Sequence, residues 1–371
     1  MLITDTLQMK NFADDRRIWQ GIPGIERTKG GRLLICFYSG KGGETFGNYA
    51  LVMRTDFNGD FGNEPIAVAY AGDGERCFDP VIWIDPSDRL WFIWSRQPQN
   101  QVWGAICEDP DAENMVWGEE FLIGRGVMMN KPTVLTTGEW LFPIALWKPN
   151  YMSAYRDPAT DIPDKAYAVQ TVDGGKSFTV LGGANLKDKS FDEHMIYERK
   201  DGTLATYVRT AYGIGVTYSH DRGISWTEGE DSGLGGPCSR FHIKKLRSGR
   251  TLLINHYNYT GRNNLTALLS EDDGKTYPYT LLLDGRDSVS YPDAVEGDDG
   301  YIYIVYDRQR GCCKDMESAL RSAREVLVAK ITEDDIINGK LQSADGYLAR
   351  VASKLGALSP QVDTSDFYPK R

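Results

Sequence analysis

The sequence predicts an all-β fold, a six-bladed β-propeller with four-stranded antiparallel blades. The main observation is a short pattern, Ser/Thr-x-Asp-x-Gly-x-Ser/Thr-aromatic, which occurs at residues 171–178, 219–226 and 270–277. The first two copies begin 48 residues apart (219 − 171), and the next two begin 51 residues apart (270 − 219). Internal repeats with periods of this length are typical of propellers and solenoids.

Each position of the repeated pattern has a physical role. The Asp carboxylate can accept hydrogen bonds from the backbone N–H groups of a tight turn, and Gly supplies the positive φ that such a turn needs. The aromatic residue then begins the next strand, where it can be buried between neighbouring sheets. We therefore expect each copy to form a turn between two strands of one blade.

Three further segments raise the count of units to six. Residues 54–61 form a degraded copy of the pattern, and weaker strand-and-turn units follow residues 102–107 and 326–331. Short β-rich runs lie between the units, at residues 33–38, 81–84, 90–94, 251–255 and 301–306. Several such segments end in Asp-Gly or Ser-Gly pairs, which favour hairpin turns. Six units of four short strands predict a propeller, and residues 314–325 are expected to form a helix attached to the last blade.

Composition limits the classes of partner. With 41% hydrophobic and 11% aromatic residues, residues 1–371 can form one closed domain with a large core. The net charge of −10 argues against nucleic acid and anionic membranes as partners. It leaves room for an anionic ligand, because a few Arg side chains can make a central funnel locally positive.

Other classes of site lack a signal in the sequence. The six Cys and four His show no metal-type spacing, and the Cys show no disulfide framework, so no metal or organic cofactor is expected. No apolar run reaches membrane length, and residues 1–15 lack a signal-peptide core. We therefore expect a cytoplasmic protein as the sequence stands, or an extracellular or periplasmic one if a leader has been removed. The oligomeric state stays open.

The repeated pattern is similar to the Asp-box (BNR repeat) of the sialidase, or neuraminidase, superfamily, and the chain resembles a bacterial-type sialidase over most of its length. Because such repeats also occur in other propellers, function has to be argued from the site. Four residues extend the resemblance. Glu193 and Arg209 have the sixteen-residue spacing of the family (209 − 193). Arg262 precedes the third copy of the pattern, where the last substrate-binding Arg of the family lies, and Tyr291 stands in a Ser-Tyr-Pro-Asp stretch that resembles the nucleophile motif.

The resemblance implies a retaining exo-glycosidase that acts on a glycan and releases a terminal acidic sugar, either sialic acid or a related ulosonic or uronic acid. Sialic acid carries a carboxylate on its anomeric carbon, so a neutral phenol meets less repulsion there than a carboxylate nucleophile would. Tyr291 would be the nucleophile and Glu193 the base that accepts its proton. Arg209 and Arg262 would bind the substrate carboxylate through forked hydrogen bonds.

The chain departs from the family pattern at one motif. Sialidases supply the first of three Arg from an Arg-Ile-Pro motif, whereas residues 21–23 read Gly-Ile-Pro. The side chains that could replace this Arg are Arg16, Arg17, Arg27 and Lys41. Loss of one such contact removes about 1.5–3 kcal/mol of binding energy, which suggests a weaker sialidase or a different acidic sugar. The acid/base Asp of the family falls in the loop after the next strand, where Glu44 is the candidate.

Further candidates have no motif behind them. His194, His256 and Trp147 are candidate substrate-binding residues that could reach the central funnel. Residues expected near the centre with no assigned role are Asp79, Arg96, Lys131 and Asp293. Two alternative functions stay open. One is a non-sialidase hydrolase or polysaccharide lyase for rhamnose- or uronate-containing glycans, using a His or Glu44. The other is a carbohydrate-binding propeller without catalysis.

Overall fold

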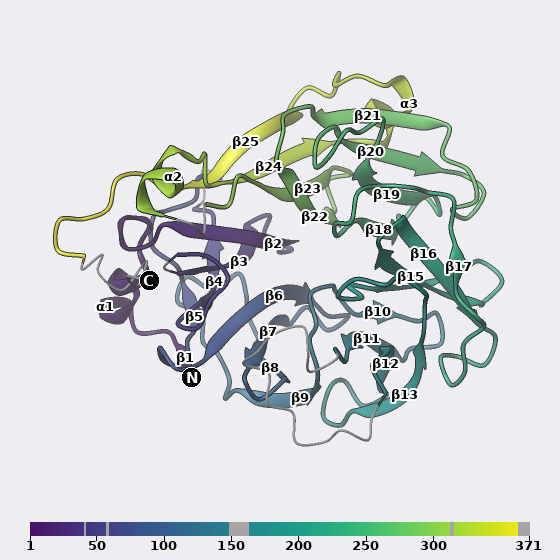
Figure 1. Ribbon diagram of the computed structural model, residues 1–371, viewed down its shortest axis with the longest axis horizontal. Coiled ribbons are helices and arrows are strands. Elements are labelled where there is room, and N and C mark those ends of the chain that lie inside the picture. The colour runs from purple at the N-terminus through teal and green to yellow at the C-terminus, as the bar shows by residue number, and fades with distance from the viewer. Residues whose placement is uncertain (41, 57–58, 148–162, 312–314, 363–371) are drawn as a thin grey trace.

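The computed structural model describes residues 1–371 except 41, 57–58, 148–162, 312–314 and 363–371. Its strands form six antiparallel sheets around a central axis (Figure 1). Five sheets have four strands, and the first sheet has a fifth. The predicted six-bladed, all-β propeller is confirmed.

The blades follow the chain order, and we number them 1 to 6. Blade 1 contains β2 (Trp19–Arg27), β3 (Leu33–Gly40), β4 (Tyr49–Arg54), β5 (Ala67–Ala69) and, at its outer edge, β1 (Leu2–Ile3). Blade 2 contains β6 (Arg76–Ile84), β7 (Leu90–Gln97), β8 (Gln101–Cys107) and β9 (Phe121–Arg125). Blade 3 contains β10 (Thr133–Val134), β11 (Trp140–Ala145), β12 (Ala166–Thr171) and β13 (Thr179–Ala184).

The second half of the ring has the same order. Blade 4 contains β14 (Met195–Glu198), β15 (Leu204–Thr210), β16 (Gly213–Ser219) and β17 (Glu230–Asp231). Blade 5 contains β18 (His242–Lys245), β19 (Thr251–His256), β20 (Leu265–Ser270) and β21 (Tyr279–Asp284). Blade 6 contains β22 (Val289–Glu296), β23 (Ile302–Arg308), β24 (Glu325–Ile331) and β25 (Tyr347–Lys354). The first strand β2 contacts both β6 and β22, and β14 contacts both β10 and β18, so the first strands line the centre.

The repeated turns have the predicted geometry, and each connects the third and fourth strands of its blade. In the first copy, Asp173 accepts hydrogen bonds from the backbone N–H groups of Lys176 (2.9 Å) and Ser177 (3.0 Å). Gly175 has a φ of 89°, and a Cβ there would stand only 2.1 Å from the ring of Trp91. The third copy repeats both bonds around Asp272, and the second copy repeats the later one, from Ser225 N to Asp221. Only Gly therefore fits this position of the first copy.

The three weaker units also lie between third and fourth strands, at β4–β5, β8–β9 and β24–β25. In the last of them a helix, α3 (Glu333–Asn338), occupies the place of the tight turn. Aromatic side chains pack between blades as expected, for example Trp83 of β6 against Trp140 of β11, with ring centroids 5.0 Å apart. The ring closes through Gln20 of β2, whose Nε2 donates to the carbonyl oxygen of Arg324 at 2.8 Å.

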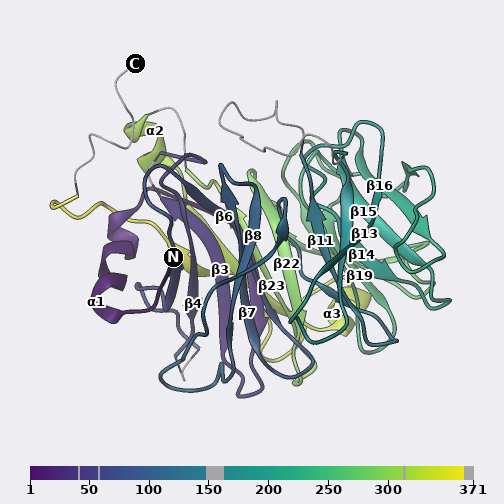
Figure 2. The same ribbon diagram turned by 90° about the horizontal axis from the view of Figure 1, so that it is seen from below.

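The helices are short and lie outside the blades (Figure 2). They are α1 (Thr6–Met9), α2 (Met316–Arg321) and α3, with 3₁₀ turns at Lys10–Phe12 and Asp14–Arg16. The helix predicted at residues 314–325 is shorter than expected. It ends at Arg321 and Glu325 already begins β24, while residue 314 lies outside the described residues. Among the described residues, no helix has the length and apolar character needed to span a membrane.

Three inner strands share a bulge near their first residues. The pairing register shifts between Gly21 and Gly24 in β2, between Phe78 and Val81 in β6, and between Ser290 and Asp293 in β22. Each bulge holds a residue with positive φ directly before a proline: Ile22 (58°), Asp79 (47°) and Tyr291 (56°). Residues before proline normally avoid this conformation, and a bulge redirects side chains. The bulges thus reorient Asp79 and Tyr291 at the central axis, in blades 2 and 6.

Candidate active site

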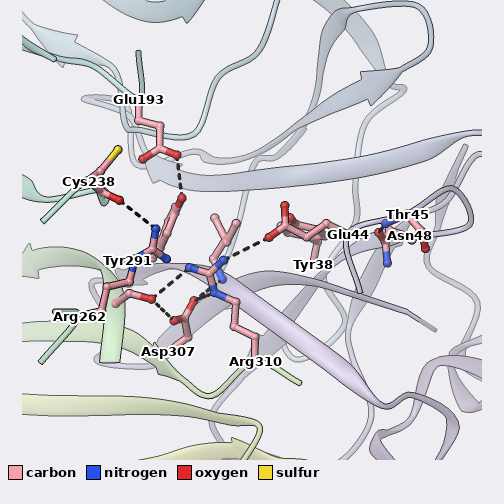
Figure 3. A network of polar contacts seen from close by, with 12 residues as sticks. Tyr38, Glu44, Thr45, Asn48, Glu193, Cys238, Arg262, Tyr291, Asp307 and Arg310 are labelled. Carbon is pink, nitrogen blue, oxygen red and sulfur yellow. Dashed lines mark hydrogen bonds and ion pairs between the residues drawn. The ribbon is translucent and has the colours of Figure 1, made fainter. Parts of the chain in front are cut away.

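The structure brings Tyr291, Glu193 and Arg209 together at the centre. The Tyr291 hydroxyl donates to Glu193 Oε1 at 2.7 Å (Figure 3). Arg209 Nη1 lies 2.5 Å from the same carboxylate oxygen and 2.9 Å from the Tyr291 hydroxyl oxygen. These three residues come from two blades, because Tyr291 lies on β22 while Glu193 and Arg209 belong to blade 4. The phenol, the carboxylate and the guanidinium that the sequence predicts for one site are thus in mutual contact.

Glu193 sits on a strained turn before β14. Phe191, Asp192 and Glu193 have φ values of 60°, 56° and 44°, which cost free energy for residues with a side chain. Neighbouring groups hold this turn in place. Trp147 Nε1 donates to the Phe191 carbonyl oxygen at 2.8 Å, and Asn130 Nδ2 donates to the Glu193 carbonyl oxygen at 2.8 Å. A turn fixed in this way keeps the Glu193 carboxylate against the phenol of Tyr291.

The phenol of Tyr291 needs a base. Burial and the charge of Glu193 raise its pKa above the usual value, and the opposing charges of Arg209, Arg310 and Arg262 reverse only part of the increase. The hydroxyl is therefore protonated at neutral pH. Because Glu193 Oε1 already accepts the hydrogen bond of this hydroxyl, it is placed to take the proton when the phenol reacts.

Within the described residues, four guanidinium groups lie around the Tyr291 side chain. One is Arg240, whose guanidinium carbon lies 5.3 Å from the ring centroid and whose Nη atoms donate to backbone carbonyl oxygens. The other three are Arg209, Arg262 and Arg310. Arg209 is described above, and the guanidinium carbon of Arg262 lies 5.4 Å from the ring centroid of Tyr291. Arg310 follows β23, and its guanidinium carbon lies 4.1 Å from that centroid. Sequence reasoning missed Arg310. Its only sequence signal is that it follows the strand paired with β22, on which Tyr291 stands.

The residues proposed from the sequence to replace the missing Arg lie elsewhere. Arg17 is buried on the far side of β3, where Nη1 donates to the Phe12 carbonyl oxygen. Arg16 pairs with its neighbour Asp15. Arg27, at the other end of β2, pairs with Asp299 at 3.1 Å. Lys41 lies outside the described residues. None of the three described candidates contacts Tyr291.

Glu44 lies in the loop after β3 and faces two arginines. Its Oε1 is 3.3 Å from Arg310 Nη1, and its Oε2 is 3.3 Å from Arg76 Nη2. The Glu44 side chain is 44% exposed. Desolvation raises its pKa, but the charges of Arg310 and Arg76 outweigh this, so the net pKa is lowered. Glu44 therefore belongs to the network in Figure 3, and it is ionised without a ligand.

The two candidate histidines have structural partners. His194 Nε2 lies 2.9 Å from the Tyr167 carbonyl oxygen, and burial lowers the pKa of His194 to about 4. His256 Nε2 lies 2.9 Å from the Val289 carbonyl oxygen, and burial also lowers its pKa. Both rings are thus neutral near pH 7. Neither ring contacts Tyr291 within the described part of the chain, and Trp147 supports the Glu193 turn. Substrate binding by these three residues stays a prediction.

Arg240 and Asp293 hold the centre together. Arg240 is buried and donates to the carbonyl oxygens of Met129 (2.9 Å), Pro23 (2.6 Å) and Tyr291 (2.8 Å), which lie in or beside three inner strands. Asp293 accepts from Ile25 N at 2.9 Å and pairs with Lys131 and His242. The partners of Asp293 therefore indicate a structural role. Arg96 of β7 pairs with Glu75.

A separate cavity of about 700 Å³ opens at the opposite ends of the inner strands. Its lining includes Glu26, Glu198, Lys244 and Glu296, each of which is the last or next-to-last residue of its inner strand. Tyr291, by contrast, is the third residue of β22. The cavity and the Tyr291 network thus lie at different levels of the central axis.

Asp79 is a further buried group beside the network. Burial raises the pKa of Asp79 to about 8. The negative charges of Glu44 and Glu193 raise the pKa further, and the positive charges of Arg76 and Arg240 reverse only part of the increase. Asp79 is only 3% exposed. At neutral pH a large fraction of the Asp79 carboxyl is therefore protonated and uncharged.

Replacing Asp79 by Asn is expected to stabilise the protein increasingly as pH rises. The unfolded chain releases the Asp79 proton near pH ~4, and the folded protein holds it until about pH 8. Between these values the folded state binds more protons, so wild-type stability falls as pH rises. Asn has no proton to lose. Denaturant unfolding should show little difference near pH ~4.5 and a gain that grows to about 4–5 kcal/mol near pH ~8, because each pH unit between the two pKa values contributes about 1.4 kcal/mol. The exposed Asp88→Asn is the control, and a difference that does not change with pH would contradict the buried neutral carboxyl.

Comparisons with known proteins agree with this architecture. Residues 31–304 match the family described as BNR repeat-like domain. No curated protein sequence gives a significant match. Among solved structures, the Hadza microbial sialidase Hz136 is similar, with a TM-score of 0.63 and 19% identity over 79% of this chain. The match covers 64% of the length of that sialidase.

Two further structures are similar over more of the chain. The leech intramolecular trans-sialidase has a TM-score of 0.65 and 11% identity over 88% of this chain and 70% of its own. The intramolecular trans-sialidase from Ruminococcus gnavus has a TM-score of 0.63 and 12% identity over 90% of this chain and 98% of its own. At these identities the likeness shows the fold. The chain belongs to the BNR repeat-like domain family, and its structure has the fold of a sialidase-like propeller.

Proposed function

We propose that the protein is a retaining exo-glycosidase that removes a terminal acidic sugar from a glycan, with Tyr291 as the nucleophile. The observation that carries this proposal is the contact of the Tyr291 hydroxyl with Glu193 at 2.7 Å and with Arg209 at 2.9 Å. A structural tyrosine would not need a buried carboxylate base and a guanidinium on the same oxygen. Sialidases are the glycosidases that use Tyr in place of a second carboxylate.

The reaction would proceed in two displacements. Glu193 takes the proton of Tyr291 while the phenol oxygen attacks the anomeric carbon, and the leaving alcohol takes a proton from Glu44. This forms a glycosyl–tyrosine bond. Glu44 then removes a proton from water, the water oxygen attacks the anomeric carbon, and the bond to Tyr291 breaks as Glu193 returns the proton to the phenol. The net result is hydrolysis with retained configuration.

Substrate charge explains the rest of the site. Arg209 and Arg262 would hold the sugar carboxylate, because a planar guanidinium forms two parallel hydrogen bonds with a carboxylate. Within the described residues, Arg262 has one hydrogen-bond partner, the Cys238 carbonyl oxygen at 3.0 Å. The remaining donors of Arg262 are thus free to bind a ligand.

The proposal can be tested by trapping the covalent intermediate. The protein is incubated with an ulosonosyl fluoride that carries fluorine next to the anomeric carbon, which slows the second displacement. We expect the intact mass to increase by one sugar residue, and peptide mapping to place the label on Tyr291. No label on wild-type protein across a panel of ulosonic and uronic glycosyl fluorides, or a label elsewhere, would contradict the proposal.

A second assay identifies the product. Similar structures include intramolecular trans-sialidases, one of them complexed with 2,7-anhydro-Neu5Ac. Turnover of an aryl glycoside in ¹⁸O-labelled water distinguishes the two outcomes. Hydrolysis places one labelled oxygen in the released sugar, whereas intramolecular transfer places none. Our proposal predicts the labelled sugar.

A further inference from the structure

The position of the missing arginine is filled by another arginine. A Cβ placed on Gly21 would stand 2.5 Å from Cδ, 2.6 Å from Cγ and 3.0 Å from Nε of Arg310. These three are the atoms nearest to that Cβ. Gly21 is not among the residues with positive φ, so its backbone would accept a side chain. The Arg310 side chain therefore occupies the space that a side chain at residue 21 would need.

Arg310 is held rigidly at one edge of its guanidinium. Its Nε donates to Asp307 Oδ2 at 2.8 Å, and its Nη2 donates to Ser290 Oγ at 3.1 Å. Asp307 is fully buried and also accepts from the backbone N–H of Ile22 at 2.8 Å. The backbone of Arg310 is fixed as well, because its carbonyl oxygen accepts from Gln20 N at 3.1 Å. These bonds keep the guanidinium beside the ring of Tyr291.

The other edge of the guanidinium is less firmly bound. Nη1 has a contact of 3.3 Å with Oε1 of Glu44, whose side chain is 44% exposed. A hydrogen bond between charged groups is normally about 2.7–2.9 Å long, so this contact is long and can be exchanged. A ligand carboxylate would be a stronger partner for Nη1.

We propose that Arg310 supplies the third guanidinium for the substrate carboxylate, in place of the arginine that β2 lacks, and that the substrate is therefore an ulosonic acid. This inference rests on the proposed function and narrows its substrate. Arg209 contacts the hydroxyl of the nucleophile, and Arg262 and Arg310 lie beside its ring. They suit a carboxylate attached to the attacked anomeric carbon, as in ulosonic acids. A uronic acid carries its carboxylate across the ring oxygen instead.

The geometry also couples binding to the acid role of Glu44. Without a ligand, the charges of Arg310 and Arg76 keep Glu44 ionised. A substrate carboxylate that takes Nη1 of Arg310 neutralises one of these charges. The pKa of Glu44 should then rise, which favours the protonated form that a general acid requires.

The test compares two probes by calorimetry. One is a 2-deoxy ulosonic acid, and the other is the same sugar with a primary alcohol in place of the carboxylate. Arg310→Met should weaken binding of the acid by about 10- to 100-fold and leave the alcohol within about twofold. The affinity of Arg310→Lys for the acid should lie between those of wild type and Arg310→Met, because Lys keeps the positive charge but cannot form two parallel hydrogen bonds with a carboxylate. Arg308→Met is the matched control. Arg308 is the last residue of β23, two positions before Arg310, and it pairs with Glu325 away from the Tyr291 network.

A double variant tests the exchange of position directly. Removing Arg310 frees the space above Gly21, so Gly21→Arg combined with Arg310→Ala should regain at least part of the lost preference for the acid. Because Asp307 would lose its charged partner, Arg310→Met is also made together with Asp307→Asn to preserve folding. An unchanged acid-to-alcohol ratio in both Arg310→Met forms, or no acid preference in wild type, overturns the inference. A third outcome separates this inference from the proposed function. If the preference for the acid depends on Arg310 but no label is trapped on Tyr291, Arg310 binds the ligand carboxylate and the proposed catalysis is refuted.

Discussion

Replacing Tyr291 by Phe is expected to lower kcat for an aryl ulosonide by about 10³-fold or more. The substitution removes the attacking oxygen and keeps the ring that lies beside Arg262 and Arg310. Glu193 and Arg209 contact each other directly at 2.5 Å, so this pair does not depend on the phenol oxygen. The fold and the carboxylate site should therefore survive, and the Kd of an ulosonic acid should change by no more than about threefold.

The measurement combines steady-state kinetics with calorimetry on the same preparation. Tyr303→Phe is the matched control, because Tyr303 is also a buried tyrosine of blade 6 whose hydroxyl donates to a carboxylate, that of Asp299 at 2.6 Å. It lies outside the Tyr291 network and should keep full activity. Turnover by Tyr291→Phe at more than about a tenth of the wild-type rate would rule out Tyr291 as the nucleophile.

The architecture could be predicted because its signals are local. Each repeated turn is formed by an Asp and a Gly within eight residues, and in the described part of the chain the hydrogen bonds of Asp173 all lie within its own turn. Such contacts leave a pattern that can be counted along the chain. The helix at residues 314–325 was less well predicted, because β24 pairs with β23 from Glu325 onward and strand pairing there ends the helical segment. Tertiary pairing overrides local preference in such cases.

The site was only partly predictable. Glu193, Arg209 and Tyr291 follow the spacing of the resemblance, and the structure brings them together. Arg310 was missed because its position depends on an absent side chain, that of Gly21, 289 residues away (310 − 21). A glycine in the sequence gives no indication of which distant residue fills its space.

Asp79 shares a sequence signal with Tyr291, a proline at the next position. Ile22, Asp79 and Tyr291 each precede a proline at the start of an inner strand, and the structure gives all three a positive φ in a bulge. The shared dipeptide indicates equivalent positions in three blades. Its effect on the pKa of Asp79 was not visible, because burial depends on how the blades close around the axis.

Replacing Glu193 by Gln should reduce kcat/KM by about 10²- to 10⁴-fold near neutral pH, and the remaining activity should increase with pH. Glutamine cannot accept the phenol proton, so reaction must wait for Tyr291 to ionise by itself. The Glu193 charge also raises the pKa of Tyr291, whereas Arg209, Arg310 and Arg262 lower it. Removing the Glu193 charge therefore lowers the pKa of Tyr291. At pH values below that pKa, each increase of one pH unit should raise the phenolate fraction of Tyr291 about tenfold.

The pH profile separates a base from a residue that only supports the fold. A structural role would lower the activity by a similar factor at every pH, because misplaced groups are not restored by hydroxide. Glu198→Gln is the matched control, since Glu198 ends the strand that Glu193 precedes and its carboxylate accepts from Thr136 N at 2.8 Å, away from Tyr291. It should keep the wild-type profile. If the pH profile of Glu193→Gln runs parallel to that of wild type, a group other than Glu193 accepts the proton of Tyr291. If its activity rises with pH, Glu193 is the base, and the reacting species is the Tyr291 phenolate.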